Sequence, residues 1–334
     1  MRVFITGGTG LIGRHLARKL VERGDHPVIL TRNADHYRRD PSIRGWELIS
    51  GDPTSVGRWQ EAIDGCDAVV NLAGHNLFVD RWNTQVKRRI RDSRVYGTER
   101  VVDAIARARQ APKVLVQGSA IGYYGNQGET DLTESSPSGS DYMAVVCREW
   151  EEAAARVESL GTRLAVIRTG VVLAPGAGAL GVMTPIFKWV PFGAAPVGSG
   201  GGALTPSTGP QWLSWIHLED LANMFLFALD HAEASGPLNG TAPHPARNSE
   251  FSRALARALW RPYVPLGPPE ALLKLILGEV ADMVTQGQKV LPEKALALGF
   301  TFRYPEVAEA LKAIFARPPR VVQAREQVAT AHHH

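Results

Sequence analysis

Residues 2–33, RVFITGGTGLIGRHLARKLVERGDHPVILTRN, decide the fold of this chain. Val3–Ile5 form a short apolar run, as expected of a strand that is buried on both faces. The apolar residues of the next segment recur at helical spacing: Leu11, Ile12, Leu16 and Leu20. Gly24 is placed to end this helix, and Val28–Leu30 supply a second buried run. The stretch therefore predicts a strand, a glycine turn, a helix and a second strand.

The glycine turn follows the spacing Gly-x-x-Gly-x-x-Gly, at Gly7, Gly10 and Gly13. Glycine lets such a turn be tight and lets backbone N–H groups approach a pyrophosphate, while the helix N-terminus adds partial positive charge. The last glycine lets the helix pack closely on the strand. This context predicts a dinucleotide site. We expect the cofactor to contact the residues of the turn: Gly7, Thr9, Gly10, Leu11, Ile12 and Gly13.

The residue after the second strand bears on the choice of cofactor. An NAD site usually places Asp or Glu there to bind the ribose 2′-hydroxyl, but this chain has Arg32. A guanidinium pairs well with a 2′-phosphate, which favours NADP(H) over NAD(H). The alternative is a surface arginine at a strand end. Asp52, in SGDP, is either a contact to the adenine end or a turn residue.

Further apolar runs alternate with helical segments along the chain. Residues 67–74 (DAVVNLAG), 113–125 (KVLVQGSAIGYYG) and 163–175 (RLAVIRTGVVLAP) predict strands, and a long helix is expected from roughly 83 to 109. The small residues Ala73 and Gly74 at the end of a strand leave room for a cofactor, so we expect contacts from them and from the neighbouring Leu72. The alternation predicts an α/β Rossmann fold with a doubly wound parallel sheet.

The composition of the sequence changes after residue 175. Segment 190–211 is rich in Gly, Pro and Ser and is either a loop near a binding cleft or a connector. A short strand and a helix follow at about 212–232, and the rest is mostly helical. We therefore assign 1–175, with 212–232, to an NADP-binding domain. Residues 176–211 and 233–316 form a smaller substrate lobe, and 317–334 are a tail that ends in a tag remnant, AHHH.

Composition excludes several classes of protein. The 334 residues are 44% hydrophobic and 21% charged, with a formal net charge of +4, as in ordinary globular proteins. The densest basic segment, KRRIRDSR at 87–94, is either a solvated helix face or a site for an anion such as phosphate. We expect no nucleic-acid partner. With no stretch of about 18 apolar residues, we also expect no membrane span.

The cysteines are too few for a disulfide framework. Cys66 and Cys147 are the only two, and no metal-ligand spacing is present, so no metal is expected. This usage fits a reducing cytoplasm. We expect a small-molecule substrate and either a monomer or a homodimer.

Several of these segments together resemble the extended short-chain dehydrogenase/reductase family. They are GGTGLIG, GSAIGYYG, RTGVVLAP and WIHLEDL. The segments NLAG, RDSRV, CREWE and VLPEKALALGFTFRYP look like one "epimerase family" subgroup, often labelled nucleoside-diphosphate-sugar epimerases. The resemblance covers the chain to about residue 315. It implies an NADP(H)-binding Rossmann domain and a C-terminal substrate region. It also implies oxidoreductase or epimerase chemistry on the carbonyl or carbinol of a small substrate, for which a nucleotide sugar is one candidate.

The resemblance also implies roles for individual residues. Ser119 would hold the substrate oxygen beside the cofactor, although an extra residue before Tyr-Gly shifts that alignment by one position. The backbone around Gly170 and Val171 would lie near the nicotinamide. Arg94 stands where an asparagine is usual, which puts the usual proton-relay water in doubt. We expect substrate contacts from a wider set: Asn76, Arg81, Trp82, Arg94, Tyr124 and Trp212.

The tyrosine that normally catalyses this chemistry lacks its partner. A tyrosine pKa near 10 is too high for a base at neutral pH, and in the family a lysine one helical turn away lowers it. Tyr142 is followed four residues later by Val146, and the sequence contains no Tyr-x-x-x-Lys. Two hypotheses remain: an oxidoreductase or epimerase with another proton donor, in which Ser119 and Tyr142 are the candidate catalytic residues, and a nucleotide-binding sensor or interaction protein.

Overall fold

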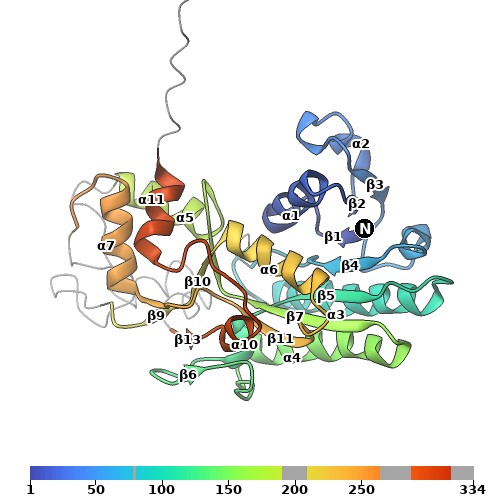
Figure 1. The fold of residues 1–334 in the computed structure, drawn as a ribbon. Helices are drawn as coiled ribbons and strands as arrows, with labels where there is room; N and C mark the ends of the chain where they lie inside the picture. The colour runs from blue at the N-terminus through green and yellow to red at the C-terminus, as the bar shows by residue number, and fades with distance from the viewer. Residues whose placement is uncertain (78–79, 190–208, 264–286, 317–334) are drawn as a thin grey trace, which may run out of the picture.

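A seven-stranded parallel sheet forms the centre of the molecule (Figure 1). The computed structural model describes residues 1–77, 80–189, 209–263 and 287–316. The strand order is β11-β7-β5-β4-β1-β2-β3, and every neighbouring pair is parallel. The strands are β1 (Arg2–Thr6), β2 (His26–Thr31), β3 (Glu47–Ser50), β4 (Ala68–Asn71), β5 (Val114–Ala120), β7 (Arg163–Thr169) and β11 (Gly236–Gly240). This order confirms the predicted doubly wound Rossmann sheet.

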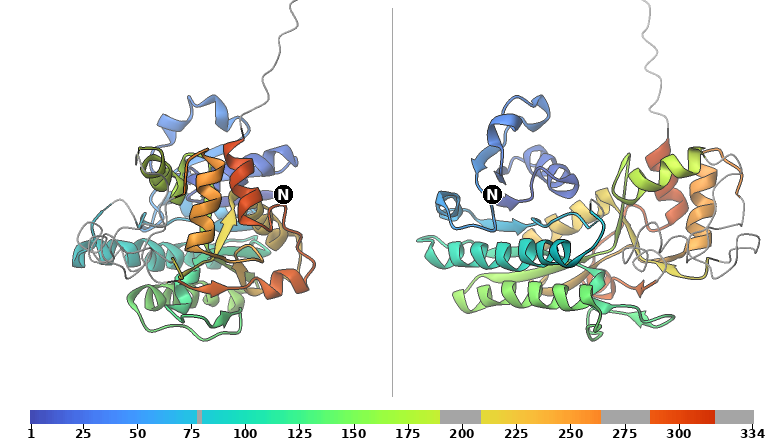
Figure 2. Two further views of the ribbon diagram at one scale, coloured as in Figure 1. Left: turned by 90° about the vertical axis from the view of Figure 1, so that its left-hand side faces the viewer. Right: turned by 180° about the vertical axis from the view of Figure 1, so that it is seen from behind.

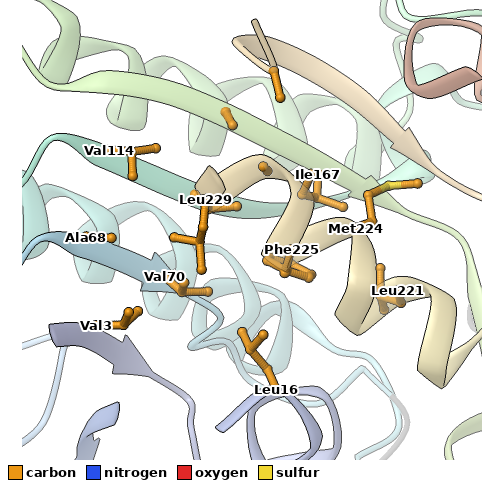
Figure 3. Close-up of a cluster of buried hydrophobic side chains, with 14 of the residues drawn as sticks. Val3, Leu16, Ala68, Val70, Val114, Ile167, Leu221, Met224, Phe225 and Leu229 are labelled. Carbon is orange, nitrogen blue, oxygen red and sulfur yellow. The ribbon is translucent and has the colours of Figure 1, made fainter. Parts of the chain in front are cut away.

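Helices cover both faces of this sheet. On one face lie α1 (Leu11–Glu22) and α6 (Leu218–Asp230), and on the other lie α3 (Thr84–Arg107) and α4 (Tyr142–Ala155). Figure 3 shows the first layer, where Leu16 of α1 and Phe225 of α6 face strand residues such as Val70. These side chains are fully buried, so the apolar stripe of each helix holds it against the sheet. The shorter connecting helices are α2 (Ala34–Tyr37), η1 (Pro41–Ile43), η2 (Arg58–Ile63), η3 (Ile121–Tyr124) and η4 (Arg156–Leu160).

A smaller lobe stands beyond the carboxyl ends of the strands (Figure 2). Its main helices are α5 (Gly178–Trp189), α7 (Asn248–Ala258) and α11 (Val307–Phe315). They share a core with buried residues such as Trp215 and Phe251. Short strands lie at or near this lobe: β6 (Asp131–Leu132), β8 (Val171–Ala174), β9 (Trp212–Leu213), β10 (Trp215–His217), β12 (Ala246–Arg247) and β13 (Lys289–Val290). The short helix α10 (Glu293–Ala297) packs instead into the core of the main sheet through Ala295.

Two boundaries differ from the sequence prediction. The strand expected over 163–175 breaks at Gly170, and β8 pairs with β10 in a separate sheet. A Cβ at Gly170 would lie 2.5 Å from the carbonyl oxygen of Ser214, so only glycine allows this crossing. Residues 236–240 were expected in the substrate lobe, but β11 pairs with β7 as the last strand of the main sheet. Its sequence, GPLNG, lacks the apolar run by which a strand is recognised.

Other predictions fall partly outside the described residues. Most of the glycine-rich segment, 190–208, lies outside them, as do 264–286 of the helical region and the tail from 317. Within the described residues, no helix combines the length and apolar character needed to cross a bilayer.

Candidate functional site

The glycine turn between β1 and α1 is closed to side chains. Gly7 has φ of 67°, and a Cβ there would lie 2.8 Å from the carbonyl of Leu72. A Cβ at Gly13 would lie 2.4 Å from the carbonyl oxygen of Gly7. Gly10 caps α1 without a side-chain hydrogen bond, and the first turn of the helix carries no acidic residue. Gly10 N donates within the turn to the carbonyl oxygen of Gly7 at 3.0 Å, whereas the N–H groups of the first helical turn have no side-chain cap and can face an anion. Thr9, Leu11 and Ile12 are half-buried beside them.

The residues that follow β2 and β3 include two predicted cofactor contacts, Arg32 and Asp52. Arg32 is exposed just after β2 and, among the residues that the structure describes, makes no hydrogen bond or ion pair. Asp52 is also exposed, but its Oδ1 accepts from the backbone N and the hydroxyl of Thr54, at 2.9 and 2.7 Å. Arg32 is thus available to a phosphate, whereas Asp52 has the bonding of a turn residue.

A polar network fixes the end of β4. The hydroxyl of Thr6 donates to Asn71 and accepts from the backbone N of Leu72 and of Ala73, both at 3.1 Å. Asn71 in turn donates to Thr98 and Gln117 at 2.8 and 2.9 Å. The backbone N–H groups of Leu72 and Ala73 are therefore used inside the protein. These two residues and Gly74 can line a cofactor, but Leu72 and Ala73 have no N–H left to give it.

Ser119 faces the protein interior. Its side chain is on the α4 side of β5, it is 5% exposed, and its hydroxyl donates to Glu151 at 2.7 Å. Glu151 is held by Arg168 through Nε and Nη2, at 2.9 and 2.8 Å. Burial of this pair opposes the charge on Arg168, but the carboxylate outweighs it and raises the pKa of the guanidinium. A substrate-binding Ser119 is therefore not supported, because its donor is committed to a buried ion pair.

Tyr142 begins α4 and uses its hydroxyl in the same way. The hydroxyl donates to the carbonyl oxygen of Lys87 at 2.5 Å, and the ring meets Trp82 edge-on at 5.7 Å. Partial burial raises the pKa of Tyr142 to about 12. A general base needs a pKa near the working pH, so both the bonding and the pKa disfavour Tyr142 as a base.

The face of α4 that contacts the end of β5 is the one that begins at Met143, the residue after Tyr142. Met143 and Cys147, one turn apart, pack with Ala120 in an apolar cluster. A Cβ at Gly122 would lie 3.4 Å from Cβ of Met143 and 3.8 Å from Sγ of Cys147. Burial raises the pKa of the Cys147 thiol to about 12, so it stays neutral. The two side chains of α4 that face the end of β5 are thus a thioether and a neutral thiol.

Arg94 lies beside this cluster, at the carboxyl end of β4. Its Nη1 donates to the carbonyl oxygens of His75 and Ile90, at 3.1 and 3.0 Å. Its charge is close enough to Tyr142 and Cys147 to act on both. Of the expected anion site at 87–94, Arg94 is the member that reaches the strand ends, whereas Arg88 and Arg89 are exposed.

The remaining predicted residues are spread over the molecule. Tyr124 is fully buried and bonds to Asn239 and Arg168, so it is not available to a substrate. Trp212 stacks on Arg247 in the smaller lobe and donates to Glu129. Trp82 is half-buried beside Tyr142, whereas Asn76 and Arg81 are exposed.

The backbone of Gly170 and Val171 is also committed. Gly170 N donates to the carbonyl of Gly240 at 3.0 Å, and Val171 N donates to that of Ser214 at 2.8 Å. These groups cannot donate to a nicotinamide while β8 is paired. No group of His, Cys, Asp and Glu among the described residues is arranged to hold a metal ion.

Three features of this region were not predicted from the sequence: the Glu151–Arg168 pair, the Met143/Cys147 face, and Ala120. One signal was present. Arg168 stands inside an apolar strand, RLAVIRT, and a buried guanidinium needs a carboxylate. Glu151 lies at i+8 from Met143 and i+4 from Cys147, so the three share one helical face.

Known proteins resemble the chain over nearly all of its length. Residues 3–239 match the model of the NAD dependent epimerase/dehydratase family, and residues 268–314 match a domain of unknown function (DUF1731). The Arabidopsis thaliana epimerase family protein SDR39U1 homolog, which is named as chloroplastic, is 40% identical over 317 residues, or 94% of this chain and 86% of that protein.

Two solved structures extend this likeness to three dimensions. Human epimerase family protein SDR39U1 (isoform 2), determined with NADPH, is 34% identical and has a TM-score of 0.81, with 94% of this chain and 99% of that one covered. A nucleoside-diphosphate sugar epimerase from Corynebacterium glutamicum is 29% identical, with a TM-score of 0.72 over 94% of this chain and 58% of that one. The chain therefore belongs to the NAD-dependent epimerase/dehydratase family of extended short-chain dehydrogenases/reductases, as its motifs indicated.

Proposed function

We propose that this protein is an NADP(H)-dependent oxidoreductase or epimerase whose proton donor is not Tyr142. The observation that carries the proposal is the glycine turn, closed to side chains, with Arg32 exposed at the end of the neighbouring strand. The turn would hold the pyrophosphate and Arg32 the 2′-phosphate. The NADPH in the human relative supports this choice of cofactor.

The chemistry follows from the position of the cofactor. The nicotinamide, when bound, would supply a hydride at the carboxyl ends of β4 and β5, where ligands bind in this fold. The chain contributes an apolar wall of Ala120, Met143 and Cys147, which excludes water from that space. None of these three side chains can exchange a proton near neutral pH, so the proton must come from another group or from water.

Binding measurements test the cofactor assignment. NADPH should bind more tightly than NADH, and Arg32→Ala should narrow that gap about tenfold or more, because one charge-assisted contact to phosphate is lost. Arg18→Ala, at an exposed arginine on α1, is the matched control and should leave the gap unchanged. Equal affinities of the wild type for the two cofactors would refute the role of Arg32.

A second function is favoured by the bonding of Tyr142 and Ser119. Both hydroxyls are committed within the protein, which fits a cofactor-binding sensor or interaction protein without efficient redox turnover. The discriminating measurement is NADPH oxidation by the purified protein against a panel of carbonyl compounds, including nucleotide sugars. Turnover with any member supports the enzyme. Tight NADPH binding with no turnover across the panel supports the sensor.

The setting of the protein is part of the proposal. We place it in the cytoplasm, as a monomer or homodimer acting on a small molecule. Two free, buried cysteines fit a reducing compartment. Size-exclusion chromatography with light scattering distinguishes the two oligomeric states.

A further inference from the structure

Arg94 differs from the arginines around it in having no acidic partner. Arg91 of α3 pairs with Glu149 of α4 at 2.6 Å, and Arg168 of β7 pairs with Glu151 of α4 at 2.8 Å. Arg94, one turn after Arg91, makes no ion pair among the described residues. Its desolvation is strong enough to lower the pKa of the guanidinium, although an arginine stays charged throughout the working range. The protein therefore holds an uncompensated positive charge at the end of β4.

The guanidinium is held rigidly in this position. Nη1 donates to the carbonyl oxygens of His75 and Ile90, and Cζ lies 5.2 Å from the ring of Trp150. The indole of Trp150 is itself fixed, because it donates to Thr98 at 2.9 Å. A Cβ at Gly74 would lie 3.2 Å from Cζ of Arg94, so a glycine there makes room for the group. A side chain fixed this way is preorganised to bind a ligand.

The edge of the Arg94 guanidinium formed by Nε and Nη2 is the one with which arginines bind anions. Both backbone carbonyls are bound through Nη1, so Nε and Nη2 remain without a partner among the described residues. The same edge of Arg168 holds Glu151, with Nε and Nη2 on the two carboxylate oxygens. Two parallel N–H donors match the two oxygens of a carboxylate or a phosphate.

We propose that Arg94 binds a two-oxygen anion, a carboxylate or a phosphate, at the carboxyl end of β4 through its Nε and Nη2. This inference rests on the proposed function and deepens it, because the site adjoins Gly74 and the apolar wall of Cys147. The anion has two sources: a carboxylate or phosphate of the substrate, or a phosphate of the cofactor. A bound anion would also neutralise the charge of Arg94, whose burial without a counter-charge costs free energy.

Titrations of three variants test the proposal. Arg94→Met removes the charge and keeps much of the length, Arg94→Lys keeps the charge without the two-donor edge, and Arg88→Met removes an exposed arginine from the same helix as a control. NADP⁺ is titrated first by calorimetry, and oxalate is then titrated into NADP⁺-saturated protein. Thermal unfolding of each variant checks that it is folded.

We expect Arg94→Met to weaken one of the two ligands at least about tenfold, since a charge-assisted bidentate contact is lost. Arg94→Lys should lose less, and Arg88→Met should match the wild type. Weakened oxalate binding with intact NADP⁺ binding assigns the site to a substrate anion, and weakened NADP⁺ binding assigns it to a cofactor phosphate.

The proposal is overturned if Arg94→Met leaves both affinities unchanged. If Arg94→Met does not fold, the wild type decides: oxalate or inorganic phosphate should raise its melting temperature more than chloride at equal ionic strength, and equal effects would overturn the proposal. Failure of the proposed function has a different signature, because wild-type protein would then not bind NADP⁺. Oxalate titrated into cofactor-free protein would still report on Arg94.

Discussion

The turn between β1 and α1 and the junction between β5 and α4 stand at the same edge of one sheet, yet they relate to the family pattern in opposite ways. At the turn, every position that must be glycine is glycine, and a Cβ at Gly7 or Gly13 would strike backbone. At the junction, the side chains facing Ala120 are Met143 and Cys147, which carry no exchangeable proton near neutral pH. The glycine turn keeps the family's spacing, whereas the junction between β5 and α4 is closed by apolar packing.

This difference follows from the separate requirements of pyrophosphate binding and of proton transfer. A pyrophosphate needs backbone N–H groups at a fixed distance, and only glycine permits that approach. Proton transfer needs titratable groups within reach of the substrate, and here those groups are turned inward to Glu151 and to the carbonyl of Lys87. Binding and chemistry can therefore diverge independently on one scaffold.

The largest expected effect on NADPH affinity is at the turn itself. Gly7→Ala places a Cβ 2.8 Å from the carbonyl of Leu72 at a residue with φ of 67°. Left-handed strain and overpacking together should cost about 3 kcal/mol of stability, and NADPH affinity should fall at least about 100-fold. Urea unfolding and fluorescence titration measure the two quantities.

Gly24→Ala is the matched control for strain alone. Gly24 has φ of 84°, but a Cβ there meets nothing within 4 Å. This variant should lose only about 1 kcal/mol and bind NADPH as the wild type does. If Gly7→Ala also kept its NADPH affinity, the turn would not be the pyrophosphate site and the contrast between the two regions would fail.

The sequence predicts the first region well and the second poorly, for a physical reason. The glycine spacing and the apolar runs of β1 and β2 are local, so they can be recognised without knowing the rest of the fold. The rotation of α4 about its axis depends on distant partners, above all Arg168 of β7, which draws Glu151 inward. In the observed orientation Met143 and Cys147 lie toward Gly122 after β5, and the hydroxyl of Tyr142 is turned to the carbonyl of Lys87. Likewise, β11 was missed because only its pairing with β7 makes GPLNG a strand.

The largest expected effect on stability, without an effect on the cofactor turn, concerns the pair that orients α4. Glu151→Ala leaves Arg168 buried without a counter-charge and Ser119 without its acceptor. The expected cost is about 3 to 5 kcal/mol of unfolding free energy, measured by urea denaturation. Glu152→Ala removes a weaker, exposed ion pair with Arg148 on the same helix and should cost less than about 0.5 kcal/mol.

A double variant shows how much of the stability lost in Glu151→Ala comes from leaving Arg168 without its counter-charge. Glu151→Leu combined with Arg168→Met removes both charges together, so it should be more stable than Glu151→Ala alone. Equal stabilities would mean that the carboxylate does not hold α4 through Arg168. In that case the account of why Met143 faces β5 would need another cause.

The smallest expected effect is at Tyr142. The comparison of the two regions predicts that this effect is small. Tyr142→Phe removes one hydrogen bond to the carbonyl of Lys87 and keeps the ring contact with Trp82. Stability should fall by about 1 kcal/mol, and NADPH affinity should not change. For any substrate found in the carbonyl panel, turnover should change less than about threefold, because a hydroxyl with a pKa of about 12 is a poor proton carrier at neutral pH. A loss of several hundredfold in turnover with intact NADPH binding would show instead that Tyr142 leaves Lys87 during the reaction, and that the junction between β5 and α4 keeps more of the family's chemistry than its packing indicates.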